Sequence, residues 1–536
     1  MVRVALLLES EPLRGAEAQL LQQLLETEYV EVALVAVVKT RAPPTDISRS
    51  TRTLINWYRW MDHVTRGANA QESARPLASY AGCLAPATII TVASPDELTA
   101  ALTGRDLEVI VCPSPIEGMR DCAGCAAFGV WWIGPPKGAA ALQELYATAT
   151  AETPLLAVLW ASTAAHPEPF CLEFGCVPLI SGVSVVKNLQ ALTPLRRNLW
   201  LGALNTLSAQ GWDALRAKGA RLQAGLSPRA YRVSERRESS ATAVARTLVR
   251  MGLRQLRHRI RQRNRVEHWR VGVRPLRDNG LSLRDTKGYR WLAAPPGHWY
   301  ADPFVLSVGA TELLYMEEFD ERRNKGRIVC AELDARGQVG AIEPALERPY
   351  HVAYPCVFEH DNQVFMIPET GFNNTVELYR SISLPFQWQF VRVLYTGPAF
   401  DTSVLQLHDR FWFFTSLVEG AGRHATKLLL FHSNRVDGEW IAHPANPISH
   451  DAHFARGGGR LFRLGSQIVR PAQDGSGTYG GAVQLRGVQA LNETEYVEAP
   501  VGSIIPARLP NAVGLHTYNS STRMEVIDCR LRMMRR

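Results

Sequence analysis

The chain has 536 residues, 46% of them hydrophobic and 21% charged, with a formal net charge of +8. This length excludes a single core and predicts two or three domains. No apolar run reaches the roughly 18 residues of a membrane-spanning helix, and the start, MVRVALLLESEPLRG, does not look like a signal peptide. Nine cysteines, an odd number, argue against a complete disulfide framework. We therefore expect a cytoplasmic protein.

Residues 1–215 alternate between apolar strands and segments with helical spacing. This alternation is typical of a doubly wound α/β domain with a parallel sheet. Helices are expected at Ala16–Leu25 and Pro95–Leu102. The expected strands are Val2–Leu8, Val30–Val38, Leu107–Cys112, Gly129–Trp132, Leu155–Ala161 and Val183–Val186.

Residues 216–267 read as a basic helical linker. Eight arginines and no acid lie between Arg246 and Arg265, and they match the whole net charge of the chain. One helical stripe is apolar, formed by Val249, Leu253, Leu256 and Ile260. A solvated helix and docking of residues 246–265 on an anionic membrane both fit this pattern. The second alternative would make the protein peripheral at a membrane. Nucleic acid fits less well, because no interleaved aromatic residues accompany the arginines.

Residues 268–536 contain five copies of a pattern in which two apolar strands flank a polar turn. The copies begin at Ala301, Ala353, Phe400, Ala455 and Gly514, so successive starts lie 52, 47, 55 and 59 residues apart. Such a period accommodates a four-stranded blade and predicts a five-bladed β-propeller. The segment HWRVGVR, from His268, is expected to close the ring against the last copy.

The propeller would bring polar strand ends together around its axis. Asp302, Tyr354 and Asp401 occupy the same place in the first three copies. Carboxylates that share a pocket repel one another, so the pKa of at least one should rise. The proline after Asp302 favours an extended backbone there. The alternative is that these acids only cap turns or face solvent.

A family resemblance follows from the motifs of this half. WYADPF, ERPYHVAYPCVFEHD with MIPET, FDTSVLQLHDRFWFFTS, and RPAQDGSGTYG with HTYN resemble the N-terminal propeller module of plant glucosamine inositolphosphorylceramide transferases. That module is itself similar to five-bladed glycoside hydrolases of the arabinanase, xylosidase and levansucrase type. The resemblance covers about Trp291 to Cys529. In the plant proteins, sugar transfer is ascribed to a separate C-terminal domain.

The resemblance implies roles for three acids. Asp302 matches the first-blade aspartate that acts as base or nucleophile in the hydrolases. Tyr354 stands where they have a pKa-tuning aspartate, and Asp401 is nearest to their third-blade glutamic acid. Glu369, in the MIPET strand, is an alternative proton donor. The predicted substrate-binding residues are Trp299, Tyr300, Glu318, Tyr354, Arg456, Arg470, Asp474 and His516.

Residues 1–215 resemble the formyltransferase fold through FGVWWIGPPKGAAALQELY and ISGVSVVKNLQALTPLRRNLWLGALNTL. Catalysis in that family uses an Asn, a His and an Asp. Here Trp132-Ile133-Gly134 stands where the histidine should be. Without its base such a site cannot move protons efficiently, so we expect a degenerate domain that serves as a scaffold, docking surface or ligand binder.

These observations predict a carbohydrate-active protein that breaks or forms a glycosidic bond in surface glycan or glycolipid metabolism. It would be glycoside hydrolase-like or a glycosyltransferase. The alternatives are a non-catalytic glycan-binding scaffold of a biosynthetic complex and a sugar N-formyltransferase. A glycan, glycolipid or nucleotide-sugar is the expected substrate. We predict no cofactor and no metal, since a lone Cys122–Cys125 pair is weak evidence for zinc.

Overall fold

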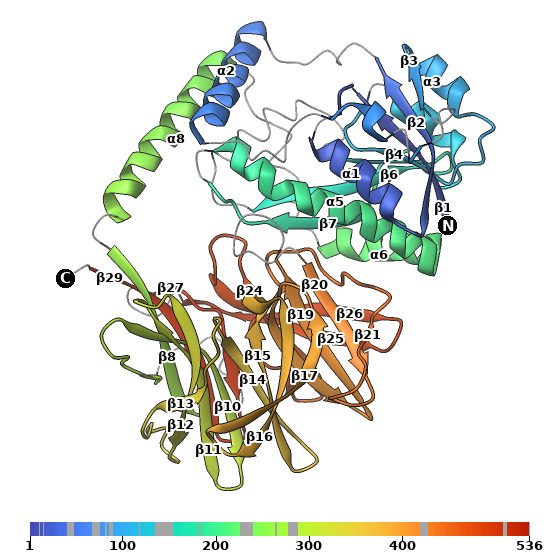
Figure 1. Cartoon of the computed structure of the whole chain (residues 1–536). Helices are drawn as coiled ribbons and strands as arrows, with labels where there is room; N and C mark the ends of the chain where they lie inside the picture. Colours follow the sequence, from blue (N-terminus) through green and yellow to red (C-terminus); the bar gives the residue numbers. More distant parts are fainter. Residues whose placement is uncertain are drawn as a thin grey trace. The chain divides into compact units, whose positions relative to one another are not determined.

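The computed structural model describes residues 1–534 except 10, 14, 40–47, 67–74, 81–82, 85–88, 117, 135–148, 150–153, 182–183, 226–239, 263–264, 277–287, 419–426 and 507–511. It divides into two compact units, Met1–Arg257 and His258–Arg536 (Figure 1). Each unit is described by itself. Among the described residues, no helix has both the length and the apolar character needed to cross a bilayer.

The first unit is built on one seven-stranded sheet with the strand order β3-β2-β1-β4-β5-β6-β7. The first five strands in this order pair in parallel, and β6 and β7 add antiparallel pairs at one edge. The sheet is therefore mixed, not wholly parallel. The strands are β1 Val2–Leu8, β2 Val30–Val38, β3 Ile89–Val92, β4 Val109–Cys112, β5 Val130–Ile133, β6 Leu155–Ser162 and β7 Phe170–Val177.

Apolar side chains cover both faces of this sheet. On one face, Leu6 packs with Leu21 of helix α1 (Gly15–Glu26) and Leu199 of helix α5 (Val185–Gln210). On the other face, Leu7 packs with Leu98 of helix α3 (Pro95–Leu102). The 3₁₀ helix η4 (Met119–Cys125) and helix α6 (Trp212–Gly225) complete this part, with a short 3₁₀ turn, η2, at Leu77–Tyr80. Helices on both faces give the α/β unit that the sequence indicates, whereas its formyltransferase likeness stays a prediction.

The expected strand at Val183–Val186 is wrong, because the long helix α5 begins there. Ser184 caps the helix, and its side chain accepts a hydrogen bond from the backbone nitrogen of Lys187. The buried carboxylate of Asp62 accepts a second bond, from the backbone nitrogen of Val186 at 3.0 Å. These two acceptors satisfy N–H groups that a helix start leaves without partners, and they outweigh the strand propensity of the valines.

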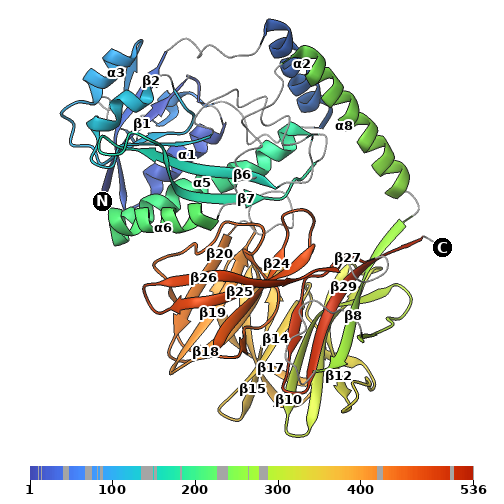
Figure 2. The ribbon, with the colours of Figure 1, turned by 180° about the vertical axis from the view of Figure 1, so that it is seen from behind.

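The second unit is a five-bladed β-propeller, and Figure 2 shows its blades from behind. Blade 1 holds β10 His298–Val308, β11 Thr311–Asp320, β12 Lys325–Leu333 and β13 Glu343–Leu346. Blade 2 holds β14 Ala353–His360, β15 Gln363–Thr370, β16 Thr375–Ser383 and β17 Gln387–Thr396, with the 3₁₀ turn η5 at Gly371–Asn373. Blade 3 holds β18 Ala399–Leu407, β19 Arg410–Leu417, β20 Lys427–Ser433 and β21 Ile441–Ala442.

The last two blades are less regular. Blade 4 holds β22 Arg456–Gly457, β23 Phe462–Leu464, β24 Gln467–Asp474, β25 Ala482–Leu491 and β26 Tyr496–Ile504. Blade 5 holds β27 Ala512–Gly514, β28 Tyr518–Ser520 and β29 Met524–Met534, together with β8 Arg265–Pro275 and β9 Arg290–Trp291. In both, short strands replace the single inner strand of the first three blades.

The ring closes by pairing the first strand of the unit with its last. β8 runs antiparallel to β29 along its full length, from Met524 opposite Pro275 to Met534 opposite Arg265. This confirms the expected closure by HWRVGVR. Blade 5 is thus built from both ends of the unit, which suits a closed propeller.

A partly buried arginine of blade 4 connects three other blades. Arg460 donates hydrogen bonds to the carbonyl oxygens of Val305, Val357 and Ser520, which belong to blades 1, 2 and 5. Its backbone nitrogen donates to the side chain of Asn519 at 2.7 Å. Because carbonyl groups carry no charge, burial lowers the pKa of this guanidinium. Arg460 therefore has a structural role at the hub.

Candidate functional site

The inner strands of the first three blades share an unusual backbone kink. Asp302, Tyr354 and Asp401 have φ values of +48°, +43° and +50°. Each lies where its strand slips register against the next strand of the blade. Left-handed φ is uncommon for residues other than glycine, and bulges that re-aim a side chain cluster beside functional sites. The extended backbone that the following proline predicted at Asp302 is therefore wrong. The position that repeats in the sequence has the same kinked backbone in all three blades.

Asp302 is buried next to a histidine and a second carboxylate. Its Oδ1 accepts a hydrogen bond from Thr517 Oγ1 at 2.7 Å and lies 3.6 Å from His516 Nδ1. Its backbone nitrogen donates to Asp528 Oδ2 at 3.1 Å. Burial raises the pKa of Asp302 to about 6, with Asp401 and Asp528 adding to the rise and His516 opposing it. This carboxyl therefore titrates close to neutral pH.

Asp528, which binds the backbone of Asp302, also holds His516. Its Nδ1 lies 2.5 Å from Asp528 Oδ2, and its ring stacks on Trp269 with 3.7 Å between the centroids. Burial alone would lower the pKa of His516, but the charges of Asp528 and Asp302 outweigh it and raise the pKa. Asp528 also accepts the backbone N–H groups of His516 and Thr517, which fixes the histidine beside Asp302.

A second acid pair shares one arginine. Arg456 is ion-paired with Asp401, and its guanidinium also lies 3.7 Å from Glu369 Oε2. Gln473 donates a further hydrogen bond to Asp401 at 3.0 Å. Burial raises the pKa of Glu369 well above its usual range, and the charge of Asp401 adds to this more than Arg456 offsets it. Glu369 therefore favours its neutral form more than a free glutamic acid does, and it lies beside an ion-paired carboxylate.

We use the name axial cluster for these residues. It comprises Asp302, Glu369, Asp401, Arg456, Gln473, Tyr479, His516, Thr517 and Asp528. Asp302, Glu369 and Asp401 are all close enough to Tyr479 to act on it electrostatically. Burial and these three acids raise the pKa of the tyrosine, so its hydroxyl stays protonated. The three predicted catalytic acids thus do come together.

Aromatic rings lie around the arginine of the cluster. The carboxyls of Asp302, Glu369 and Asp401 are buried, and Arg456 is largely buried, with 12% of its side chain exposed, whereas Tyr479 is half-buried. The guanidinium of Arg456 lies 5.1 Å from the ring centre of Tyr479 and 5.7 Å from that of Phe400. Phe372, just after the strand that carries Glu369, is 55% exposed and meets Phe400 edge-on at 6.2 Å. We call Phe372, Phe400 and Tyr479 the aromatic rim.

Tyr354 shares the kink but has different surroundings. Its ring is fully buried, and its hydroxyl lies 2.8 Å from Ser403 Oγ. The same hydroxyl accepts a hydrogen bond from the backbone nitrogen of Gly459 at 2.7 Å. These contacts join blades 2, 3 and 4, so they support a structural role for the tyrosine.

Three predicted substrate residues lie along the strands of blade 1. Trp299 stacks on Phe319 with 4.5 Å between ring centroids. Tyr300 is buried, and burial together with Glu318 raises its pKa to about 12. Glu318 is ion-paired with Arg327 at 2.6 Å. These contacts are made within the blade and include no member of the axial cluster.

Two further predicted residues have partners within blade 4. Arg470 is fully buried and binds Glu498 at 2.7 Å and the carbonyl oxygen of Phe454 at 2.9 Å. Asp474 accepts hydrogen bonds from Ser476 and from Gln484 at 2.8 Å. Both sets of contacts stabilise the blade.

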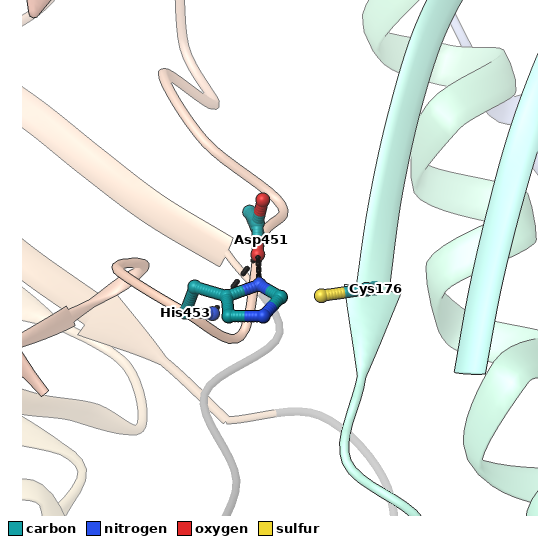
Figure 3. Close-up of side chains that lie close together, drawn as sticks. All are labelled: Cys176, Asp451 and His453. Atoms are coloured by element: carbon teal, nitrogen blue, oxygen red, sulfur yellow. Dashed lines mark hydrogen bonds and ion pairs between the residues drawn. The ribbon is translucent and has the colours of Figure 1, made fainter. Parts of the chain in front are cut away.

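A histidine of the same unit lies within electrostatic reach of Asp474. Figure 3 shows His453 paired with Asp451, and Nδ1 lies 2.6 Å from Oδ1. Burial would lower the pKa of His453, but Asp451 and Asp474 outweigh it and raise the pKa. No motif of the sequence points to this pair, which lies in the connection between β21 and β22.

One group of side chains in the cluster has the donor types of a metal site. Ligand atoms of Asp302, His516 and Asp528 lie within 4.8 Å of one another. Both oxygens of Asp528 already accept backbone hydrogen bonds, and the histidine favours its protonated form. The group is thus satisfied by bonds within the protein and needs no cation to hold it.

The propeller matches a known family by sequence. Residues 291–528 match the family model described as glucosamine inositolphosphorylceramide transferase 1, N-terminal. The protein of that name from Oryza sativa subsp. japonica is 36% identical over 211 residues, which cover 38% of this chain and 28% of the rice protein. The Arabidopsis thaliana protein is 28% identical over 212 residues, with the same coverage. The expected resemblance is confirmed, and the chain matches less than a third of the length of these relatives.

Solved structures give weaker likenesses. The family 117 glycoside hydrolase Zg3597 of Zobellia galactanivorans aligns with a TM-score of 0.33 and 14% identity, over 44% of this chain and 85% of its own. The α-L-arabinanase of Cellvibrio cellulosa aligns with a TM-score of 0.29 and 14% identity, over 38% and 77%. The five-bladed assignment therefore rests on the strand pairing within the chain.

Proposed function

We propose that this chain is a carbohydrate-active protein that takes a glycan, glycolipid or nucleotide-sugar at its axial cluster and acts on a glycosidic bond. The observation that carries the proposal is the gathering of three buried carboxyls, in which Glu369 and Asp401 share Arg456 and Asp302 lies beside His516. The raised pKa values of Glu369 and Asp302 agree with it. The sequence match to a sugar-transferring family supports it. The activity named for those relatives belongs to much longer proteins.

The chemistry follows from the separated pKa values. Breaking a glycosidic bond needs one carboxyl that donates a proton to the leaving oxygen and one carboxylate that acts as base or nucleophile. Glu369 would be the donor, because burial and the charge of Asp401 raise its pKa. Asp302 would be the ionised partner above about pH 6. Arg456 and His516 would offer positive charge to hydroxyl or phosphate oxygens of the substrate.

The aromatic rim would provide the first contact with a sugar. Sugar rings present C–H faces that pack on aromatic side chains, and binding sites combine such surfaces with a few polar groups. Phe372 is exposed enough to make this contact, and Phe400 and Tyr479 flank the arginine behind it. Phe372→Ala should weaken sugar binding several-fold and leave the turnover of bound substrate nearly unchanged.

The test begins with a thermal-shift screen of nucleotide-sugars, oligosaccharides and glycosylated inositol phospholipids. Any compound that raises the melting temperature is then assayed for glycosidic bond cleavage or transfer. Asp302→Asn and Glu369→Gln should each abolish product formation. Asp409→Asn is the matched control, since Asp409 is an exposed aspartate at a turn of blade 3. Full activity in the Asp302→Asn protein would remove this aspartate from the chemistry.

A glycan-binding scaffold is the second candidate, and one observation favours it. Each acid of the axial cluster already has a partner within the protein: Asp302 has Thr517, while Asp401 and Glu369 share Arg456. Under this alternative the same compounds bind but are returned unchanged. Calorimetric binding with no product over a long incubation would select it, and the acid variants would then alter affinity alone.

A further inference from the structure

Two basic helices of the first unit leave apolar side chains exposed. Helix α2 covers Arg49–Arg66 and helix α8 covers Ala241–Gln262. Ile55 and Tyr58 of α2 pack with Val244 and Met251 of α8 and with Val185 at the start of α5. Figures 1 and 2 show the two helices side by side from both directions. Each helix therefore buries one apolar face in this shared core.

The exposed side of α8 carries an apolar stripe. Val249, Leu253 and Leu256 are 62%, 51% and 56% exposed. They are spaced by four and three residues, so they lie on one face of the helix. The fourth member predicted from the sequence, Ile260, has a side chain outside the described residues. Such a row of large aliphatic groups in water is unfavourable unless something covers it.

Helix α2 exposes two tryptophans. Trp57 is 52% and Trp60 is 64% exposed, and they are three residues apart on one face. Tryptophan is the side chain most typical of the boundary between water and lipid, because its ring is apolar and its N–H is polar. The sequence patterns predict no element between Val38 and Pro95 and therefore miss this helix.

The charge of both helices is almost wholly positive. α2 contains four arginines and α8 contains six, whereas Asp62 is the one acid among the residues of the two helices. Asp62 is buried and holds the start of helix α5. Arg246, Arg250 and Arg257 are exposed, as are Arg49 and Arg52. The outer surface of the pair thus joins arginines to large apolar groups, which is the composition of helices that lie in a membrane interface.

We propose that the α2–α8 pair docks on an anionic lipid surface, with Val249, Leu253, Leu256, Trp57 and Trp60 entering the headgroup boundary and the arginines binding lipid phosphates. Anionic lipid complements both features at once, because it offers negative charge beside an apolar layer. Nucleic acid would complement the arginines but would leave the aliphatic stripe of α8 in water. The inference is independent of the reaction at the propeller axis.

The test is co-sedimentation of the full chain with vesicles of phosphatidylcholine alone and of phosphatidylcholine with 30% phosphatidylserine, a fraction of roughly physiological order. We expect binding to the anionic vesicles at least tenfold tighter than to the neutral ones, and weaker binding at high salt. Val249→Ser/Leu253→Ser/Leu256→Ser and Arg246→Gln/Arg250→Gln/Arg257→Gln should each weaken it at least tenfold. Trp57→Ser/Trp60→Ser should weaken it severalfold.

Matched variants of the propeller serve as controls. Ile382→Ser/Phe390→Ser removes exposed apolar groups, and Arg290→Gln/Arg322→Gln/Arg336→Gln removes exposed charges. Both should bind vesicles like the parent, and circular dichroism should show that all variants are folded. Equal binding by the α8 variants and the parent would overturn the proposal. It would also be overturned if the parent bound an oligonucleotide but neither kind of vesicle.

Discussion

Arginine occupies two opposite settings in this protein. At the propeller axis, Arg456 is largely buried, ion-paired with Asp401 and near Glu369. On helix α8, Arg246, Arg250 and Arg257 are exposed on a helix that has no acid. A buried charge without its partner is very costly, whereas an exposed charge costs almost nothing. Arg456 should therefore contribute mainly to the stability of the fold, whereas the arginines of α8 should contribute mainly to binding of the proposed lipid surface.

The largest effect is expected from Arg456→Met. This substitution would leave the carboxylate of Asp401, whose side chain is 2% exposed, buried without its cation. Removing one partner of a buried pair costs about 3 to 5 kcal/mol of unfolding free energy. Urea denaturation measures this loss, with Arg336→Met as the exposed control that should stay within about 0.5 kcal/mol of the parent. A loss as small as that of the control would show that the pair does not hold the axis.

The next effect is a pH dependence centred on Asp302. Its pKa is about 6 in the folded protein, against about 3.9 in an unfolded chain. The folded state thus binds the proton more tightly, so this group's contribution to stability is full below pH 4 and is lost as the pH rises to 6. The two units of difference correspond to about 3 kcal/mol at most.

Comparing the parent with Asp302→Asn isolates this contribution. The stability of the parent minus that of the variant should fall between pH 4 and pH 6 and then level off. The raised pKa of His516 acts in the same direction, since its stabilisation is also lost with rising pH. A difference that is flat across this window would mean that Asp302 has an ordinary pKa.

Tyr354→Phe should have an intermediate effect on stability. It tests whether Tyr354 supports the fold or binds substrate. The change removes the hydroxyl that meets Ser403 and Gly459 and leaves both groups buried. Unpaired buried groups cost about 1 to 3 kcal/mol. Thermal unfolding should show this loss, while sugar binding and turnover at low temperature stay near the parent values. A selective loss of binding with unchanged stability would instead place Tyr354 among the substrate ligands.

The smallest stability effect is expected from Arg246→Gln/Arg250→Gln/Arg257→Gln. Arg246 and Arg250 are one helical turn apart, and like charges at this spacing repel by a few tenths of a kcal/mol. The variant should therefore be as stable as the parent or slightly more stable, by less than about 0.5 kcal/mol. A loss of several kcal/mol in urea denaturation would show that these arginines hold the first unit together.

The sequence predicts the repeats better than it predicts the site. Five copies of one pattern are enough to place the five blades and the closing strand at His268. The same spacing brings Asp302 and Asp401 to the axis, since equivalent residues of different blades lie at the same distance from the axis of a propeller. Glu369 joins them because it ends the neighbouring strand of its blade.

Three residues in or beside the axial cluster have no repeat to reveal them. Trp269 comes from the strand that closes the ring, Tyr479 from the turn after β24, and Asp528 from the last strand. Each occupies its position through tertiary packing alone. Conversely, Arg470 and Asp474 occur in motifs that predict a site but bind partners within their own blade. Arg470 pairs with Glu498, and Asp474 accepts hydrogen bonds from Ser476 and Gln484. A polar residue at a strand end does not reveal which way it faces.

Helix α5 shows the same limit in the first unit. The valines around Ser184 predict a strand, yet the decisive contact comes from Asp62, more than a hundred residues earlier. Tertiary contacts of this kind override local propensity.

The central claim is that Glu369 is a protonated acid at neutral pH within the axial cluster. Infrared spectroscopy tests this directly, since a protonated carboxyl has a C=O stretching band distinct from that of a carboxylate. The parent protein and Asp409→Asn should both show the protonated band at pH 7, and Glu369→Gln should lack it. A parent spectrum with no such band, or one that Glu369→Gln leaves unchanged, would contradict the account.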